Sequence, residues 1–274
     1  MAPASQQLQT SNGIQRYAAG VEYLGTGYSG WQALKGAQGV QSALESAVSS
    51  VADQPVKVTA AGRTDAGVHA LQQVIHFDTT AQRSDYAWLL GINTNLPRDI
   101  SLRWLLRPAA QRFHARHSAL ARSYRYVIHN HRARSALLLA RAAWWPQALD
   151  ADAMQRAAQC LVGEHDFSAF RDSQCQSKTP VRKVKSLNVF RRDDFVVIDI
   201  CANAFLHHMV RNITGTLAEV GTGKQAEGWV AAVLAGRDRR QGGMNAPPEG
   251  LYFIGPEYPA EFALPAPPRP WFPA

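Results

Sequence analysis

The alternation of apolar and polar residues divides the first part of the chain into strands and helices. Four segments have the alternating or continuously apolar pattern that is typical of β-strands: residues 16–23, 56–61, 70–78 and 100–106. Apolar side chains at helical spacing predict a helix over residues 41–51, and Ser84 is placed to cap a second helix through residue 90. The predicted order is therefore β-α-β-β-α-β.

A similar order recurs further along the chain. The sequence predicts strands at residues 121–129, 184–192, 195–202 and 251–255, with Asp193 and Asp194 as a tight turn between the second and third. It predicts helices over residues 150–162, with Asp150 as the cap, over 202–220 and over 228–234. Two such units predict an α+β protein with two ferredoxin-like halves and antiparallel sheets. The halves would cover residues 15–110 and 111–260, between a disordered tail at 1–14 and a proline-rich tail at 261–274.

Length and cysteine content narrow the class of protein. The chain has 274 residues, of which 46% are apolar, and this is enough for one large domain or two smaller ones. Three scattered cysteines without a C-x-x-C pair indicate a reducing compartment. The first residues lack the apolar core of a secretory signal, and no apolar run approaches the roughly 20 residues needed to cross a bilayer. We therefore expect a soluble cytoplasmic protein.

Basic residues are concentrated in one segment. The formal net charge is +8, and arginines outnumber lysines 23 to 6. Residues 101–141 contain nine arginines and no acidic residue, with histidines and aromatic residues between them. This pattern indicates phosphate binding, because cations without counter-ions repel one another unless an anion lies among them; the alternative is a solvated surface without a ligand. A second basic stretch, residues 171–185, fits RNA contact and an ordinary hairpin approach equally well.

Two other patterns carry less weight. Residues 25–30 read GTGYSG and match G-x-G-x-x-G, but no amphipathic helix follows and no acidic residue ends the next strand. They are better interpreted as a mobile glycine-rich loop than as a dinucleotide site. His207, His208 and Cys201 suggest a metal, but adjacent histidines on a helix point about 100° apart, and the deaminase zinc motif is absent. We therefore expect no metal.

The turn between the second and third strands has an unusual composition. It reads GRTDAG and places Arg63 two residues before Asp65, between Gly62 and Gly67. A guanidinium nearby keeps a carboxylate ionised where water is excluded, and the glycines permit backbone angles and a close approach that other residues resist. The alternative is a structural ion pair that stabilises a hairpin, and the residues alone leave both interpretations open.

This turn, extended to GRTDAGVHA, resembles the signature of the tRNA pseudouridine synthase A family. Further blocks resemble the family in the right order: GWQ at 30–32, NTNLP at 93–97, FHAR at 113–116, RSYRY at 122–126, DFSAFR at 166–171, NAFLHHMVRN at 203–212 and EGLY at 249–252. The resemblance covers about residues 16–259. The sequence departs from it at Leu24, where an aspartate is common, and in the ALQQV stretch after the signature, which leaves the detail of the first loop open but not the chemistry.

The resemblance implies an activity and its surroundings. The activity is conversion of uridine to pseudouridine at positions 38, 39 and 40 in the anticodon arm of tRNA, with the target base flipped out of its stack. The resemblance implies no organic cofactor and no metal. It also implies two ferredoxin-like halves around a central, positively charged cleft, and a homodimer without a membrane partner.

The resemblance also implies roles for individual residues. Asp65 would be the essential aspartate, Arg63 would enter the space left by the flipped base, and Arg211 would pair with Asp65. Tyr124 would stack on the uracil, and Leu251 would line its pocket. The other expected tRNA contacts are Arg116, His114, Phe113, Arg83, Arg132, Gln174, Gln176 and Lys178. From the residues alone, Tyr124 fits the core of a sheet equally well, and Arg211 fits a solvated helix face.

Three rival functions remain open on the sequence alone. An RNA-binding protein without catalysis would explain the basic segment but not an aspartate beside it. An oxidoreductase built on residues 25–30 would lack the acidic residue that binds ribose. A pseudouridine synthase acting on another RNA would use the same catalytic residues. Mapping modified uridines after incubation with mixed tRNA separates all three.

Overall fold

The structure, a computed structural model, describes residues 13–32, 38–110 and 112–269. Its N-terminal half contains strands β1 (Gln15–Tyr23), β2 (Thr59–Ala60), β3 (His69–Thr79) and β4 (Ile100–Leu106), with helices α1 (Val40–Ala52) and α2 (Asp85–Asn95). These elements follow the predicted order β-α-β-β-α-β. Residues 1–12 and 270–274, which make up much of the two expected tails, lie outside the described residues.

The C-terminal half repeats the predicted order with two short strands added. Its strands are β5 (Ala121–His129), β6 (Ala143–Trp144), β7 (Gly163–Asp166), β8 (Val181–Arg192), β9 (Phe195–Ala202) and β10 (Leu251–Glu257). Its helices are α3 (Ala151–Ala158), α4 (Met209–Gly221) and α5 (Trp229–Gly236). The additions are β6 and β7.

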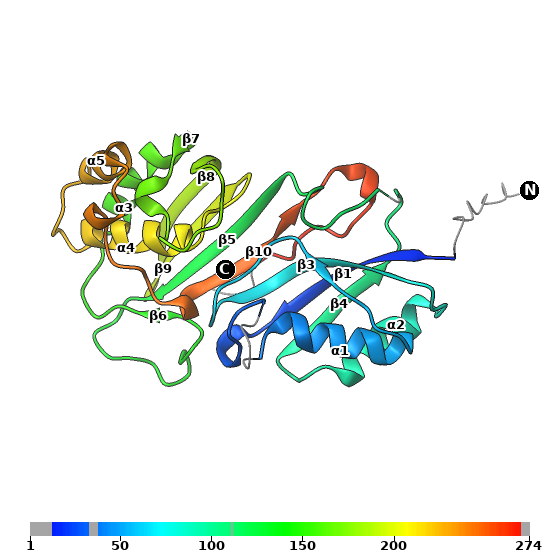
Figure 1. Cartoon of the computed structure of the whole chain (residues 1–274). Coiled ribbons are helices and arrows are strands. Elements are labelled where there is room, and N and C mark those ends of the chain that lie inside the picture. The colour runs from blue at the N-terminus through cyan, green and yellow to red at the C-terminus, as the bar shows by residue number, and fades with distance from the viewer. Residues whose placement is uncertain (1–12, 33–37, 111, 270–274) are drawn as a thin grey trace, which may run out of the picture.

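The strands of the described residues form one continuous sheet (Figure 1). Its main order is β4-β1-β3-β10-β5-β9-β8-β7, while β2 pairs with β3 and β6 with β5. The two halves join where Tyr252 and Phe253 of β10 pair in parallel with His69 and Ala70 of β3. The expectation of separate antiparallel sheets is therefore wrong at this junction. Pairing β3 with β10 satisfies backbone groups that would otherwise form a free sheet edge.

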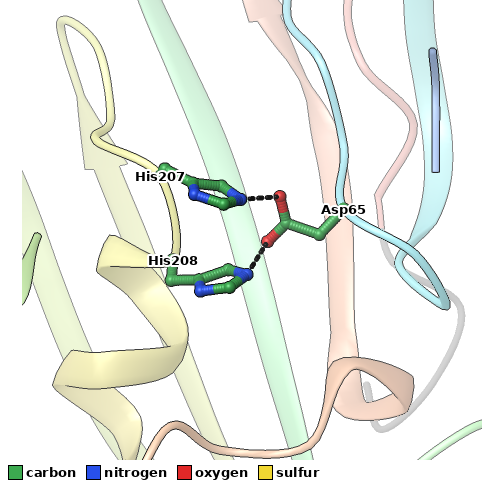
Figure 2. Close-up of side chains that lie close together, drawn as sticks. All are labelled: Asp65, His207 and His208. Carbon is green, nitrogen blue, oxygen red and sulfur yellow. Dashed lines mark ion pairs between the residues drawn. The ribbon is translucent and has the colours of Figure 1, made fainter. Parts of the chain in front are cut away.

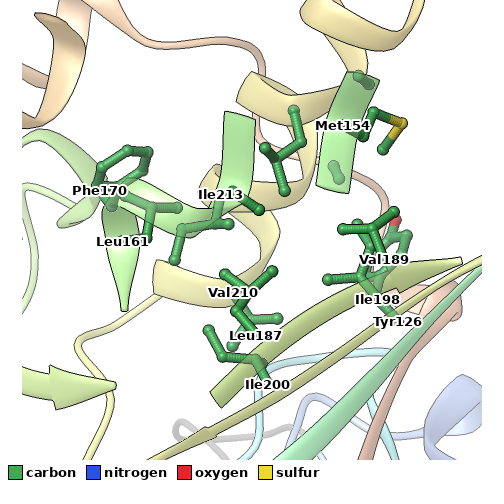
Figure 3. Packing of buried hydrophobic residues seen from close by; sticks show 14 of the residues in the cluster. Tyr126, Met154, Leu161, Phe170, Leu187, Val189, Ile198, Ile200, Val210 and Ile213 are labelled. Carbon is green, nitrogen blue, oxygen red and sulfur yellow. The ribbon is translucent and has the colours of Figure 1, made fainter. Parts of the chain in front are cut away.

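Each half has its own hydrophobic core. Helices α1 and α2 cover the N-terminal half, and α3, α4 and α5 cover the C-terminal half (Figure 1). Figure 3 shows Val210 of α4 packed against Leu187 of β8 and Ile200 of β9. Tyr124 of β5 packs against both cores and thus marks their junction. Within the described residues, no helix is both long enough and apolar enough to cross a membrane.

The predicted caps and the tight turn are confirmed. The Ser84 hydroxyl accepts the N–H of Ala87 (3.2 Å), and the Asp150 carboxylate accepts the N–H of Ala153 (2.9 Å). Each bond satisfies a donor that the first turn of a helix leaves free. Asp193 has a φ of +50° in the turn between β8 and β9.

The strand expected at residues 56–61 shrinks to two residues, Thr59–Ala60. Side chains of α1 take the backbone donors that would have paired with a neighbouring strand. The N–H of Val56 donates to the Ser49 hydroxyl (2.9 Å), and the N–H of Val58 donates to the Glu45 carboxylate (3.2 Å). Local side-chain bonds of this kind compete with a sheet ladder.

The helix expected from residue 202 begins only at Met209. Before it, the side-chain oxygen of Asn203 accepts the N–H groups of Lys183 (3.0 Å) and Ala204 (2.8 Å). His208 then adopts the left-handed conformation, with a φ of +61°. These bonds hold residues 203–208 in an irregular connection, which changes where the two histidines point.

The proline-rich tail expected from residue 261 is packed in its first part. Phe262 is buried in the core of the N-terminal half. The Gln72 amide donates to the carbonyl of Pro265 (3.2 Å). A tail that begins at residue 261 therefore needs correction, because the chain stays on the body of the protein at least to Pro265.

Candidate active site

Asp65 lies in the loop between β2 and β3. The loop is fixed at Thr64, whose carbonyl accepts the N–H of Trp31 (2.9 Å) and whose hydroxyl lies 2.7 Å from that of Tyr23. Gly67 has a φ of +79°, a conformation that favours glycine. The side chain of Asp65 is 24% exposed. A firmly held loop thus presents a carboxylate that solvent can reach.

The glycine-rich segment at residues 25–30 packs against this loop. A Cβ atom at Gly30 would lie 2.6 Å from the carbonyl oxygen of Thr64, so only glycine allows this approach. The expected free, mobile loop is therefore a packed one. Gly62 has open space around it and no left-handed φ, so the conformational role expected of both flanking glycines applies to Gly67 alone.

Arg211 reaches Asp65 from α4, as expected. Its Nη1 atom lies 3.6 Å from Oδ2 of Asp65. Its Nε donates to the carbonyl of Ala246 (2.7 Å), and the side chain is only 12% exposed. A guanidinium anchored to the backbone is a fixed positive charge, which attracts the Asp65 carboxylate and restricts its orientation. The solvated alternative for Arg211 is thereby excluded.

His207 and His208 also point at Asp65 (Figure 2). His207 Nε2 lies 3.4 Å from Oδ1 of Asp65, and His208 Nε2 lies 3.5 Å from Oδ2. The two rings are stacked, with centroids 3.9 Å apart. The prediction that they diverge was wrong, because it placed them on a helix, whereas both precede α4. The feature of the sequence that could have revealed this contact is the pair of adjacent histidines itself.

A second carboxylate lies on the other side of the histidine pair. Asp172 Oδ2 is 2.8 Å from His208 Nδ1, and Asp172 Oδ1 is 3.4 Å from His207 Nδ1. Burial raises the pKa of Asp172, but the N–H of Gln174 and the His208 side chain outweigh this, and the pKa is lowered overall. Sequence analysis missed this residue, because nothing in its neighbourhood distinguishes it from an ordinary loop aspartate.

Asp65, His207 and His208 offer metal-ligating atoms that lie within 4.8 Å of one another. A single ion requires the lone pairs of both imidazoles to converge on one point. Here the rings are stacked and each Nε2 faces its own carboxylate oxygen (Figure 2). Arg211 also places a positive charge at this carboxylate. The geometry fits ion pairs better than a shared ion, and the absence of a metal stays a prediction.

Tyr124 lies between the two cores and close to Asp65. Its ring centroid is 4.9 Å from that of Phe205 and 5.0 Å from that of Phe253. Burial raises the pKa of Tyr124, and the charge of Asp65 raises it further, so the hydroxyl stays protonated. The neighbouring Tyr23 is fully buried, and burial raises its pKa to about 12. Tyr124 is therefore both a packing residue and a neighbour of the carboxylate.

Arg63 and Leu251 have opposite surroundings. Arg63 is exposed and has neither a hydrogen bond nor an ion pair within the described residues. Leu251 is 5% exposed and belongs to the core of the C-terminal half. The Arg63 side chain can therefore move into contact with a bound molecule, whereas Leu251 offers a bound base only a small exposed surface.

Phe113 does not lie where a tRNA contact would. Its side chain is fully buried, and its ring packs edge-on against Tyr258 (5.1 Å) and Phe262 (5.3 Å). A ring without exposed surface reaches RNA only if the core opens. We therefore reassign Phe113 to the core, where it supports the segment that carries Arg116.

His114 and Arg116 lie on the outer side of the same segment. The His114 Nδ1 accepts the N–H of Arg116 (3.2 Å), and its ring packs at a tilt against that of His76, with the centroids 4.6 Å apart. Burial lowers the pKa of His114, and the neighbouring His117 adds to this. The Arg116 side chain is exposed and lacks an ion pair within the described part of the chain, which suits a phosphate contact.

Three further expected contacts are exposed on the loop at residues 171–180: Gln174, Gln176 and Lys178. Arg171 orders this loop by donating to the carbonyl of Cys175 (2.7 Å). The N–H of Asp172 donates to the carbonyl of His207 (3.1 Å). The loop is therefore attached to the residues that surround Asp65.

Arg83 and Arg132 are exposed outside this immediate site. Arg83 follows the last residue of β3, whereas Asp65 precedes the first, so the length of the strand separates them. Arg132 lies in the long connection between β5 and β6. Both stay predicted phosphate contacts.

The arginine-rich segment is partly neutralised by distant residues. The pairs are Arg103 with Glu22, Arg112 with Glu261 and Arg125 with Asp199. The inference from missing counter-ions was therefore too strong, because acids from other parts of the chain supply them. Arginines of the segment that are exposed and lack an ion pair within the described residues are Arg107, Arg116, Arg132, Arg134 and Arg141, of which Arg107 donates to the Tyr17 hydroxyl (3.1 Å).

Arg122 connects three segments around the site, and sequence analysis gave it no role. Its Nη1 donates to the carbonyls of Ala119 (3.1 Å) and Asn203 (3.0 Å). Its Nη2 donates to those of Ala61 (3.1 Å) and Arg116 (2.6 Å). Ala61 precedes the Asp65 loop, and Asn203 begins the segment with the histidine pair. A side chain that binds four backbone carbonyls leaves no sequence pattern.

Comparison with known proteins identifies the family of the chain. The family model described as tRNA pseudouridine synthase matches residues 19–117 and 157–259. Curated proteins from Salmonella typhimurium, Salmonella paratyphi B and Salmonella newport are each 53% identical over 260 residues, which is 95% of this chain and 96% of each relative. The chain therefore belongs to the tRNA pseudouridine synthase family, and it is an isomerase. Each of these relatives is named tRNA pseudouridine synthase A, which confirms the resemblance seen in the sequence.

Proposed function

We propose that this protein converts uridine to pseudouridine at positions 38, 39 and 40 of the tRNA anticodon arm, with Asp65 as the catalytic residue. One observation carries the proposal. The carboxylate of Asp65 is reachable by solvent, lies 3.6 Å from the anchored guanidinium of Arg211, and is electrostatically coupled to Tyr124. The relatives named tRNA pseudouridine synthase A support tRNA as the substrate.

The reaction detaches uracil from C1′ of the ribose, rotates the base and rejoins it through C5. It is an isomerisation, so it needs no redox carrier and no energy source. As an anion, Asp65 acts either by attacking C1′ or by taking the proton of C2′ to give a glycal. Both routes place the carboxylate beside the ribose, and both benefit from a fixed positive charge that orients it.

The target base must leave its stack before Asp65 can reach the sugar. Flipping costs a few kcal/mol. Arg63 is exposed and has no ion pair among the residues that the structure describes, so it is suited to fill the gap that the base leaves. Tyr124 would stack on the flipped uracil and recover roughly 1–3 kcal/mol. Arg116 and the loop with Gln174, Gln176 and Lys178 would hold the tRNA backbone.

We also infer the finer architecture. The N-terminal half has β1 between β4 and β3, with β2 on the far side of β3, and this order supports a ferredoxin-like unit. Two such halves would flank a positively charged cleft in a cytoplasmic homodimer. Small-angle scattering of the protein at assay concentration tests the dimer, because a monomer mass would exclude it.

The test of the function is position-specific mapping of pseudouridine in tRNA treated with wild type and with Asp65→Asn. Asparagine keeps the size of the side chain but cannot act as an anionic nucleophile or base. We expect Asp65→Asn to bind tRNA and form no pseudouridine, while the exposed Asp194→Asn control modifies positions 38–40 normally. Modification by Asp65→Asn would remove Asp65 from the mechanism. Wild-type modification at other uridines would remove the proposed specificity.

A further inference from the structure

Two carboxylates face one pair of stacked imidazoles. Asp65 belongs to the N-terminal half and lies at the Nε2 atoms of His207 and His208. Asp172 belongs to the C-terminal half and lies at their Nδ1 atoms, with its shortest contact, 2.8 Å, to His208. The histidine pair is therefore a bridge between the proposed catalytic residue and a second acid that does not contact it.

Hydrogen bonding limits how the bridge faces the two acids. An ionised carboxylate only accepts hydrogen bonds, and a neutral imidazole carries one N–H. The contact of Asp172 with Nδ1 of His208 therefore fixes which edge of the ring is turned toward Asp65.

Asn245 also reaches the same edge of the His208 ring. Its Nδ2 atom lies 3.2 Å from Nδ1 of His208, while its Oδ1 is buried without a donor among the described residues. Asp172 and Asn245 thus both approach His208 at Nδ1, opposite the Nε2 atom that faces Asp65.

Other charged groups around the bridge come from several elements. Cys175 lies on the Asp172 loop, with its Sγ accepting the N–H of His207 (3.4 Å). The charged or titratable groups that face the cluster from the packed elements are Asp65, Tyr124, Asp172, Cys175, Arg211 and Arg239. Arg211 acts on Asp65, and Arg239 acts on Asp172. Of these groups, Asp172 alone acts on the bridge from the Nδ1 side with a negative charge.

We propose that Asp172 is a positioning residue for the reaction: by accepting the N–H at Nδ1 of His208, it holds the stacked histidine pair in the orientation in which both Nε2 atoms face Asp65. The pair in turn lies at both oxygens of the Asp65 carboxylate and directs it toward the ribose. This inference rests on the function proposed for Asp65. It adds a group that acts on the chemistry through two imidazoles without touching the substrate.

The proposal predicts a particular kinetic signature for Asp172→Asn, which keeps the shape and removes the charge. Turnover at saturating tRNA falls, while the affinity for tRNA changes little, because Asp172 acts on Asp65 rather than on the RNA. Asp172→Glu, which keeps a charged acceptor for His208 Nδ1, restores turnover in part.

The experiment compares turnover at saturating tRNA and affinity for tRNA in wild type, Asp172→Asn, Asp172→Glu and the control Asp194→Asn, which removes an exposed charge in the β8–β9 turn. Lower turnover at unchanged affinity in Asp172→Asn, partly restored in Asp172→Glu, supports the proposal, since a merely structural role would lower the amount of folded protein without separating turnover from affinity. Equal turnover of Asp172→Asn and wild type overturns it. Asp65→Asn is assayed alongside: if it is inactive while Asp172→Asn equals wild type, only this inference fails.

Nitrogen NMR of the wild-type histidines provides a test that needs no folded Asp172 variant. The His208 signal is assigned by its loss in His208→Gln. We expect a proton on Nδ1 at neutral pH. A ring protonated only at Nε2 overturns the proposal.

Discussion

The Nη1 atom of Arg211 lies 3.6 Å from Oδ2 of Asp65, although one residue belongs to α4 and the other to the β2–β3 loop. Arg211 is held in place by its bond to the Ala246 carbonyl, so its charge cannot follow the carboxylate if Asp65 moves. The pair thus joins the two halves of the protein at the proposed reacting group. Changes on either half should affect the chemistry.

Replacing Arg211 should lower turnover more than binding. Arg211→Gln removes the charge, and we expect the single-turnover rate to fall about a hundredfold, because a catalytic group displaced by about 1 Å can lose that much. Arg211→Lys keeps the charge but not the forked geometry and should be intermediate. Single-turnover rates at saturating tRNA measure this, with the exposed Arg240→Gln as control. Equal rates for Arg211→Gln and the control would contradict the role.

Arg63→Ala should also lower turnover more than affinity, because an exposed arginine that fills the gap of a flipped base acts after binding. The defect should shrink on a tRNA whose target uridine is mispaired, since such a base is already easier to unstack. Rates on paired and mispaired substrates measure the difference. An unchanged rate on the paired substrate would rule out the flipping role.

Arg116→Ala should weaken tRNA binding and flatten its salt dependence. Each phosphate contact contributes roughly 0.7–0.9 to the slope of log affinity against log salt, so the slope should fall by about that amount. The control is Arg156→Ala, which removes the same charge from α3, where Arg156 pairs with Glu227. If both variants keep the wild-type slope, Arg116 contacts no phosphate.

Arg122→Gln should reduce activity through position rather than charge. Its four backbone acceptors tie the Asp65 loop to the Arg116 segment and to the start of the histidine segment at Asn203. An amide can replace at most two of these bonds. We expect turnover and tRNA affinity to fall together, with faster amide exchange at residues 61–66. Faster amide exchange in other segments, with no change at residues 61–66, would contradict this role.

Acid should destabilise the protein through His76. Burial, with Arg16 and His114 adding to it, lowers the pKa of His76 from 6.5 to about 4. As the pH falls, the unfolded state takes up the proton before the folded state does. The contribution of His76 to the free energy of unfolding is therefore complete above about pH 6.5 and is lost between about pH 6.5 and about pH 4, a loss on the order of 3 kcal/mol.

His76→Asn can still accept the N–H of Ala115, which His76 Nδ1 accepts at 3.1 Å, but it does not titrate. Denaturant unfolding between pH 7 and 4 should therefore show a shallower loss of stability for this variant than for the exposed His131→Asn control. If the two variants lose stability equally as the pH falls, groups other than His76 cause the loss of stability in acid.

The sequence by itself determined many of the local elements and pointed to the proposed reacting group. Periodicity located β5, α1 and α5, because apolar spacing reports which face of an element is buried. Ser84 and Asp150 were identifiable as caps because a cap bonds to a residue three positions away. The GRTDAGVHA signature singled out Asp65 and, through the family, Arg211.

Only the tertiary structure decided which residues from different halves meet. The parallel pairing of β3 with β10, the neutralisation of Arg125 by Asp199 and the four bonds of Arg122 join segments far apart in the chain. The direction of His207 and His208 depended on residues 203–208, which form an irregular connection between β9 and α4. Local pattern records the environment of each residue and not the partner that supplies it, so the acids on the two sides of the histidine pair became visible only in the folded chain.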